Sequence, residues 1–151
     1  MRKFKFNLEP LFEYRQRLEE ISHKEFGESL ERLKDEERRI EELKELYLKS
    51  SHEIDSLKET GAGRQEMELY HSYMSGLKRH ISEQDRILVQ VSAVIERKRG
   101  ELIEASKNRK VIELMKERSL SSYNKRMDKV EQKESDELVT ARFGRNGNDE
   151  K

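Results

Sequence analysis

The sequence Thr60-Gly61-Ala62-Gly63 is the strongest break in the middle of a chain that otherwise reads as long helix on both sides. Glycine loses the most conformational entropy in a helix and accepts positive φ, so two glycines within three positions end a helix and let the chain reverse. We therefore predict an all-α fold, a long antiparallel two-helix coiled coil. The expected bounds are a helix over about 8–59, a turn at 60–63 and a helix over about 65–142, in a single domain of residues 1–143.

The composition fits long charged helices better than a globular core. Of the 151 residues, 32% are hydrophobic and 42% are charged, which suffices for one apolar seam. The 32 Lys and Arg residues balance the 32 Asp and Glu residues, which disfavours nucleic acid or an anionic membrane as a partner. The absence of cysteine excludes disulfides and thiolate metal sites. The most apolar stretch, residues 87–95, is shorter than the ~20 residues of a membrane span, and no signal-peptide pattern is present, so we expect a soluble intracellular protein.

Apolar residues recur at three- and four-residue spacing before the turn, as in the seam between supercoiled helices. The pattern slips near residues 22–26, which resembles a stutter, and then repeats every seven residues. Glu36 and Ser50 fall on seam positions without apolar side chains. The predicted seam residues are Leu11, Tyr14, Leu18, Ile21, Phe26, Leu33, Ile40, Leu43, Tyr47, Ile54 and Leu57.

After the turn the same spacing runs from Leu77 to Ile112, with Gln84, Lys98 and Arg109 at seam positions. Polar residues in a seam lower stability but can fix the register of the helices. Beyond Ile112 we expect the frame to shift, and the serines at positions 119, 121 and 122 could interrupt the helix. The shifted stripe consists of Met115, Leu120, Tyr123, Met127, Val130 and Leu138.

A reversal centred near residue 62 places Leu11 opposite Glu113, so residues from about 114 onward have no partner helix within the chain. This predicts a C-terminal helical overhang of ~40 Å beyond a paired part of ~75 Å. The apolar stripe of this overhang would be exposed unless it is buried by self-association, by a fold-back of the last helix or by another protein. The tail, residues 144–151, is expected to be disordered.

The N-terminal residues alternate as a short extended arm, in which Phe4, Phe6 and Leu8 are apolar. Asn7 is the expected N-cap of the first helix, and Pro10 lies in its first turn, where a missing N–H costs nothing. Two readings of the phenylalanines stay open. They form either a staple on the start of the helix or an exposed aromatic arm for a partner.

No motif in the chain points to catalysis. Glu20-x-x-His23 and Glu68-x-x-His71 have the spacing of di-iron bundles, but the hairpin separates them by several turns. Phosphate-binding loops and nucleophile elbows are missing, and a two-helix rod has no enclosed pocket, so we predict a non-enzyme without metal or cofactor. Nucleic-acid binding is disfavoured because acidic residues neutralise the face that carries Arg97, Lys98, Arg99, Lys107, Arg109 and Lys110.

Three stretches together resemble the flagellar FliJ family, a coiled-coil component of the flagellar type III export apparatus. The resemblance covers nearly the whole chain. The stretches are the opening Phe4-Lys-Phe6-x-Leu8-x-x-Leu11-x-x-x-Arg15, the segment Leu69-Tyr70-x-x-Tyr73-x-x-x-Leu77-x-x-x-Ile81 after the glycine break, and the end Gln132-Lys133-x-x-Asp136-Glu137-Leu138-x-x-x-Arg142-Phe143.

The resemblance implies a non-enzymatic central stalk and export chaperone, similar to the two-helix shaft of the rotary ATPase γ subunit. Its implied partners are the hexameric export ATPase FliI, with the terminal end of the rod in the central hole, and the cytoplasmic domain of the gate protein FlhA. Export chaperones are possible further partners, and the implied location is the cytoplasm, peripheral at the inner face of the membrane through those partners. A structural or adaptor coiled coil that dimerises in parallel without an ATPase stays open as the alternative.

The residues that match the family's contact regions form two sets. For the gate these are Leu43, Leu46, Tyr47, Tyr73 and Leu77, of which Leu43, Tyr47 and Leu77 are also seam residues, whereas Leu46 and Tyr73 are not. For the ATPase ring they are Leu11, Arg15, Met127, Val130, Gln132, Leu138, Arg142 and Phe143.

Overall fold

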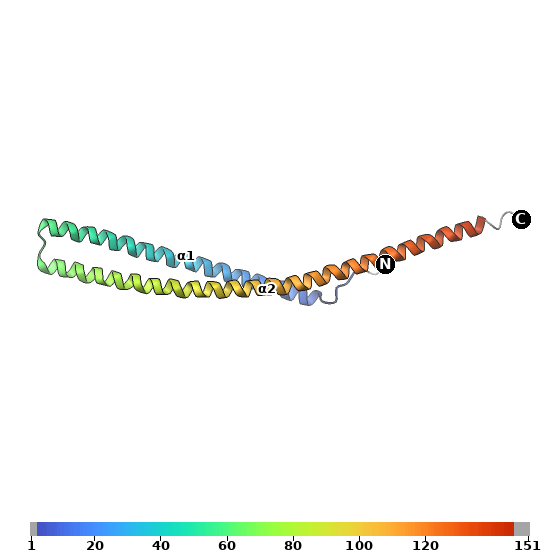
Figure 1. Ribbon diagram of the computed structural model, residues 1–151, viewed down its shortest axis with the longest axis horizontal. Coiled ribbons are helices and arrows are strands. Elements are labelled where there is room, and N and C mark those ends of the chain that lie inside the picture. The colour runs from blue at the N-terminus through green and yellow to red at the C-terminus, as the bar shows by residue number, and fades with distance from the viewer. Residues whose placement is uncertain (1–2, 147–151) are drawn as a thin grey trace. The chain divides into compact units, whose positions relative to one another are not determined.

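The computed structural model describes residues 3–146, which form two helices, α1 (Glu9–Thr60) and α2 (Arg64–Asn146) (Figure 1). Within these residues there is no strand, and neither helix has an apolar stretch long enough to cross a membrane. The helix α2 continues past the expected end at residue 142, while residues 147–151 of the expected disordered tail lie outside the described residues.

Contacts divide the chain into two compact units, which we describe one at a time. The hairpin unit is Glu19–Glu104, and the terminal unit combines Met1–Leu18 with Ala105–Lys151. The single domain expected over residues 1–143 stays a prediction.

The reversal between the helices uses Gly61 as the sequence predicts. Gly61 has a φ of 78°, in the left-handed region that glycine enters without a steric penalty. The N–H of Ala62 donates to the carbonyl of Leu57 at 3.1 Å, the hydrogen bond of a Schellman C-cap. The N–H of Met67 then donates to the carbonyl of Gly63 at 3.1 Å, which starts α2. The glycine pair therefore caps one helix and begins the next.

In the hairpin unit α1 and α2 lie side by side and antiparallel, which confirms the predicted coiled coil and excludes an unbroken helix through the turn (Figure 1). Burying an aliphatic side chain of this kind contributes about 1.5–3 kcal/mol, so a single seam can hold the two helices together. The buried apolar residues are Ile40, Ile54, Met74, Leu77, Val91 and Ile95.

The predicted slip near residues 22–26 is wrong. Ile21 is 54% exposed, whereas Ser22, Phe26 and Ser29 are half-buried, in frame with Leu33, Glu36 and Ile40 further along α1. The heptad frame therefore continues through residues 22–26 with serines at seam positions. Serine is small enough to sit between two helices, and the Ser29 hydroxyl donates to the Glu25 carbonyl at 2.9 Å.

The terminal unit corrects the expected frame in the same way. Beyond the buried Ile112, the half-buried residues are Glu113, Lys116, Ser119, Tyr123 and Met127, of which Lys116, Ser119 and Tyr123 keep the spacing of the seam. Tyr123 and Met127 belong to the predicted stripe, whereas its members Met115 and Leu120 are 43% and 41% exposed. Tyr14 of α1, also predicted in the seam, is 52% exposed. The serines do not interrupt α2, which is continuous to Asn146. The seam keeps the same period as far as Tyr123 and includes the polar residues that occupy its positions.

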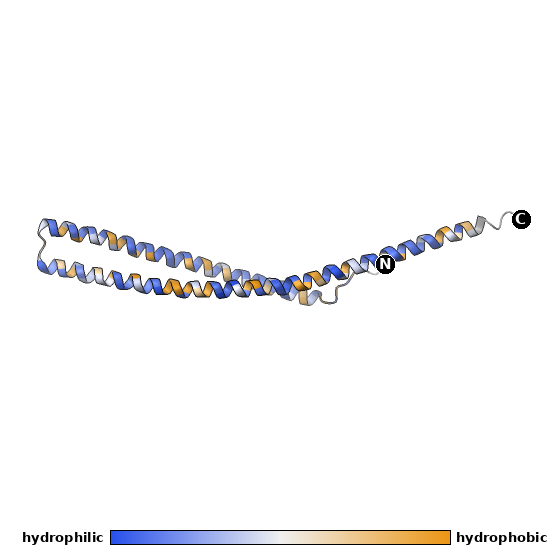
Figure 2. Cartoon of the chain, viewed as in Figure 1, coloured by the Kyte–Doolittle hydropathy of each residue, from blue (hydrophilic) through white to orange (hydrophobic). Residues whose placement is uncertain are grey.

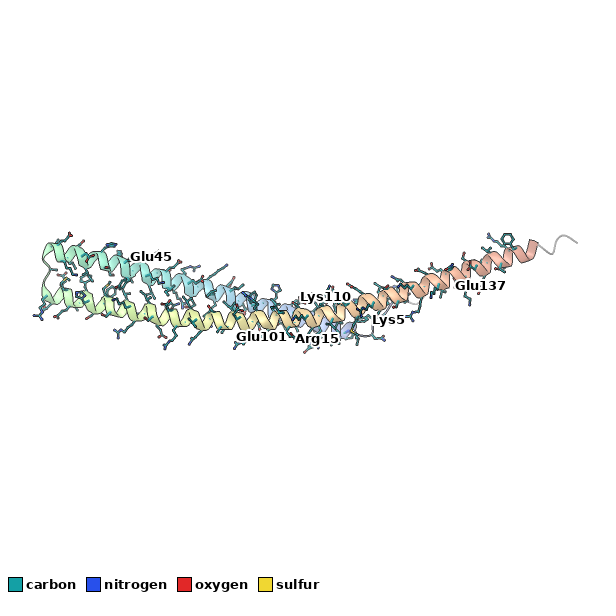
Figure 3. All side chains as sticks on the ribbon, viewed as in Figure 1. Lys5, Arg15, Glu45, Glu101, Lys110 and Glu137 are labelled. Carbon is teal, nitrogen blue, oxygen red and sulfur yellow. The ribbon has the colours of Figure 1, made fainter. Side chains whose placement is uncertain are left out.

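Hydrophilic residues make up much of both helices (Figure 2), and 42% of the chain's residues are charged. Glu45 and Glu101, labelled in Figure 3, are exposed examples. Ion pairs at i,i+3 and i,i+4 recur along both helices, such as Lys24–Glu28 at 3.9 Å and Arg64–Glu68 at 3.4 Å. Each such pair stabilises a helix by only about 0.2–0.5 kcal/mol, so the seam decides the fold.

Candidate partner-binding surfaces

The five residues that match the gate-contact region divide into packed and exposed side chains. Leu77 is buried, and Leu43 and Tyr47 pack against the cluster that it forms with Ile54 and Met74. The side chains of Leu46 and Tyr73 are 40% and 46% exposed. Of these five residues, therefore, Leu46 and Tyr73 are the two that present apolar surface to a partner without opening the seam.

The hairpin unit exposes further apolar residues that are not among the contact residues expected from the sequence. Leu69 is 72% exposed on the face that it shares with Tyr73 one turn away, and Leu48 is 59% exposed. The sequence feature that could have marked Leu69 as a contact residue is its position outside the predicted seam. With Tyr73, it extends the apolar surface of α2 near the turn.

A polar layer crosses the seam in the middle of the hairpin unit. Glu36 and Gln84 are each 7% exposed. The Gln84 amide donates to the Glu36 carbonyl at 3.1 Å and also to the Glu36 carboxylate, which Arg39 contacts at 3.3 Å. Because a buried polar group is costly unless it is paired, this layer favours the one register that brings the two residues together.

Cations cover aromatic rings at the edges of the seam. In the hairpin unit, the ammonium nitrogen of Lys78 lies 5.8 Å from the ring centroid of Tyr47, and the guanidinium of Arg99 lies 5.8 Å from that of Phe26. These distances fall within the range of cation–π attraction. Each contact joins α1 to α2 and keeps a half-buried ring from facing water alone.

Lys98, predicted at a seam position, is half-buried and reaches across the hairpin. Its Nζ lies 2.9 Å from a carboxylate oxygen of Glu25 on α1 and 3.3 Å from one of Glu101 on α2. The hydrogen bond with Glu25, followed by that with Glu101, raises the pKa of Lys98. The ammonium group is therefore satisfied at the seam edge.

In the terminal unit the N-terminal arm lies along α2, an arrangement that neither sequence reading described. Phe4, Phe6 and Leu8 are half-buried, and the ring centroid of Phe4 lies 5.5 Å from that of Tyr123. The part of α2 with a partner therefore extends past the expected limit near residue 114. The alternation of apolar and polar residues indicated a half-buried segment, but not the helix on which it packs.

The start of α1 is fixed against α2 by a second group of contacts. Nζ of Lys116 lies 2.8 Å from the Glu9 carboxylate and 5.1 Å from the ring centroid of Phe12. The Phe12 N–H donates to the Leu8 carbonyl at 2.9 Å, so Leu8, and not Asn7 as expected, is the N-cap. These bonds position the arm relative to the first turn.

The residues that match the ring-contact region lie in the terminal unit with graded exposure. Leu11, Arg15 and Met127 are half-buried. Beyond Met127, every described side chain of α2 is exposed, and the large apolar ones include Val130 at 48%, Leu138 at 67% and Phe143 at 76%. Gln132 and Arg142 are exposed among them.

Electrostatic pairing within the terminal unit centres on Glu113. Its carboxylate lies 2.9 Å from Lys110 and 2.9 Å from Arg109. The hydrogen bond from Lys110 and, to a smaller extent, that from Arg109 lower the pKa of Glu113 below its ordinary value of 4.5. Both partners lie on α2, so this cluster supports the helix itself.

Among residues 3–146, no three His, Asp or Glu side chains come together in an arrangement that could hold a metal ion. The Glu-x-x-His motifs around His23 and His71 therefore do not assemble a shared site within the described chain.

The sequence pattern of the flagellar FliJ protein family matches residues 4–148. No curated protein matches the chain. Among solved structures, a protein described as a YscO homologue from Chlamydia trachomatis is similar, with a TM-score of 0.51 and 18% identity over 99% of this chain and 100% of that one. At this identity the likeness supports the fold.

Proposed function

The chain belongs to the flagellar FliJ protein family, and from this premise we propose that it is a non-enzymatic stalk and export chaperone that couples the hexameric export ATPase FliI to the export gate. Flagellar protein export is the role that the family carries. Insertion into the ATPase ring and contact with the gate are the finer parts of the proposal.

The observation that carries the ring contact is the exposed apolar surface of α2 beyond Met127. Val130, Leu138 and Phe143 expose about half or more of their side chains in a stretch otherwise rich in charge. Val139, 50% exposed, is next to Leu138 and one turn before Phe143, so large apolar side chains gather near the end of α2. A contiguous exposed apolar patch marks a protein contact. A single helix with such residues fits the central hole of a ring, with Leu11 and Arg15 as further contacts.

The test is the ATPase activity of the FliI ring with and without the purified chain. We expect the full chain to raise the rate, and a truncation after residue 126, which keeps the Phe4–Tyr123 contact, to abolish the increase. The variant Leu138→Glu/Phe143→Glu should also fail, while Lys133→Glu, a charge change on the same helix, should still stimulate. No stimulation at saturating chain would refute the ring contact.

The gate contact is proposed for the exposed pair Leu46 and Tyr73. The variant Leu46→Ala/Tyr73→Ala should lose capture by the FlhA cytoplasmic domain and keep its thermal midpoint, because neither side chain is buried. By contrast, Leu77→Ala should lower the midpoint, since truncating a buried leucine costs about 2–5 kcal/mol. Unchanged capture by the double variant would exclude this surface. Such contacts would hold the chain in the cytoplasm, peripheral at the inner face of the membrane.

A further inference from the structure

Positive charge gathers in one part of the terminal unit, although the chain as a whole is neutral. The arm brings Lys3 and Lys5, whose side chains are exposed, alongside α2. Lys5 is labelled in Figure 3. Arg118 and Arg126 lie on the face of α2 that the arm follows. Between these two walls runs a groove of about 590 Å³. Its lining consists of residues 3–8 together with Met115, Arg118, Ser119, Ser122, Tyr123 and Arg126.

The lining combines cations with aromatic rings and, within the described residues, contains no carboxylate. None of the acidic residues nearest along the chain lines the groove. Glu9 is paired with Lys116 at 2.8 Å, and Glu117 and Asp128 are exposed outside the groove. The rings of Phe4 and Tyr123 are half-buried where the arm meets the helix. The groove is thus an apolar strip between two basic walls.

We propose that this groove binds an acidic segment of a partner protein, with carboxylates on the basic walls and an apolar or aromatic side chain on the Phe4–Tyr123 strip. This surface is distinct from the apolar residues beyond Met127, and it goes beyond the proposed stalk function because it does not depend on which protein supplies the segment.

The spacing of the cations favours a peptide over a single small anion. Arg118 and Arg126 are eight residues apart on one helix, which separates them by about 12 Å along its axis. A phosphate or sulfate is held by cations that converge on one point, whereas cations spread along a groove match carboxylates spread along a chain. Lys3 and Lys5 extend the same pattern on the opposite wall, about 7 Å apart along an extended backbone.

The groove also favours a peptide over a membrane surface. A lipid headgroup layer is broad and flat, so it would meet the exposed lysines without reaching the strip between the walls. The four cations also lie on two walls instead of one outward face. A narrow extended segment can contact both walls and the strip together, which is how charge complementarity gives specificity.

The test is fluorescence anisotropy with the full chain and a fluorescein-labelled eight-residue peptide in which glutamates alternate with phenylalanines. We expect binding at low salt that weakens as sodium chloride is raised, because the contacts are exposed and screened. The variant Arg118→Glu/Arg126→Glu should weaken binding about tenfold or more, since two attractions become repulsions. The matched control Lys34→Glu/Lys44→Glu makes the same change in net charge on exposed residues of the hairpin unit and should bind as the unchanged chain does.

Several outcomes would overturn the proposal. One is equal weakening by both double variants, which would reduce the effect to net charge. Others are equal binding of a peptide with glutamine in place of glutamate, complete competition by millimolar inorganic phosphate, and binding of phosphatidylserine vesicles without binding of the peptide. Circular dichroism of each variant verifies the helix content. Because this assay contains no ATPase, its failure leaves ATPase stimulation unaffected, and the reverse also holds.

Discussion

Replacing Gly61 with alanine should destabilise the hairpin, whereas the same replacement at Gly100 should stabilise it. At both positions an added Cβ meets no heavy atom within 4 Å, so neither change creates a clash. The two sites differ in backbone conformation. Gly61 has a φ of 78°, while Gly100 lies within α2. The pair therefore isolates the effect of the left-handed conformation.

The magnitudes follow from the backbone alone. An L-residue in the left-handed region costs about 1–2 kcal/mol. Alanine also reduces the conformational entropy of the unfolded chain, which returns about 0.4–1 kcal/mol, so Gly61→Ala should lower the free energy of unfolding by about 1 kcal/mol. In the interior of a helix, Gly100→Ala should raise it by about 0.5–1 kcal/mol. Asparagine tolerates the left-handed region, so Gly61→Asn should lose less than Gly61→Ala.

Urea unfolding followed by circular dichroism at 222 nm measures both changes. With a denaturant slope of about 1–3 kcal/mol per molar, the two alanine variants should move the midpoint in opposite directions by roughly half a molar each. If Gly61→Ala raised the midpoint as Gly100→Ala does, residue 61 would not be left-handed, and the capped reversal that defines the hairpin would be wrong.

Three further outcomes are expected. Gln84→Leu should lower the free energy of unfolding in urea melts by about 1–3 kcal/mol, because the Glu36 carboxylate stays buried without its amide donor. The double variant Glu36→Leu/Gln84→Leu should restore the free energy of unfolding, and an equal loss in the single and double variants would mean that Glu36 and Gln84 are uncoupled. A spin label on Lys5→Cys, the sole cysteine of that variant, should become more mobile when Tyr123→Ala is added, because the Phe4–Tyr123 ring contact of about 0.5–1.5 kcal/mol holds the arm on α2. An unchanged spectrum would contradict the packing of the arm on α2. Pairing lowers the pKa of Glu113, so its contribution to the stability of the folded chain is complete above the unfolded-state pKa and is lost as pH falls through the lower folded-state value. The thermal midpoint of Glu113→Gln should therefore depend less on pH below about 5 than that of the unchanged chain.

The sequence was sufficient to predict the turn and the seam of α2 because both rest on strong local signals. Glycine is the residue that a left-handed cap requires, and Gly61 has that conformation. From Leu77 to Ile112 the apolar residues recur often enough to keep the period visible across Gln84 and Lys98. Each of these predicted seam positions is buried or half-buried in the structure.

The errors have one physical cause, which is that an apolar residue is a weaker marker of the seam than the period itself. Near Ser22 and beyond Ile112 the helix–helix contact includes serine and lysine, and nearby apolar residues point outward instead. Lys116 fits there because it has both an acidic and an aromatic partner on the other segment. Such partners come from residues distant in sequence, so spacing along one helix cannot reveal them. The contact of the arm with Tyr123 was missed for the same reason.

The Glu36–Gln84 contact also limits how the length of the hairpin can vary among relatives. The two residues lie on opposite sides of the Gly61 reversal and are 48 positions apart. A deletion on one side alone would slide the carboxylate out of reach of the amide and place it against an aliphatic layer. Insertions should therefore occur in matched sets of seven residues, one on each side of the reversal, and a relative with an unmatched set should have an apolar residue in place of both polar ones.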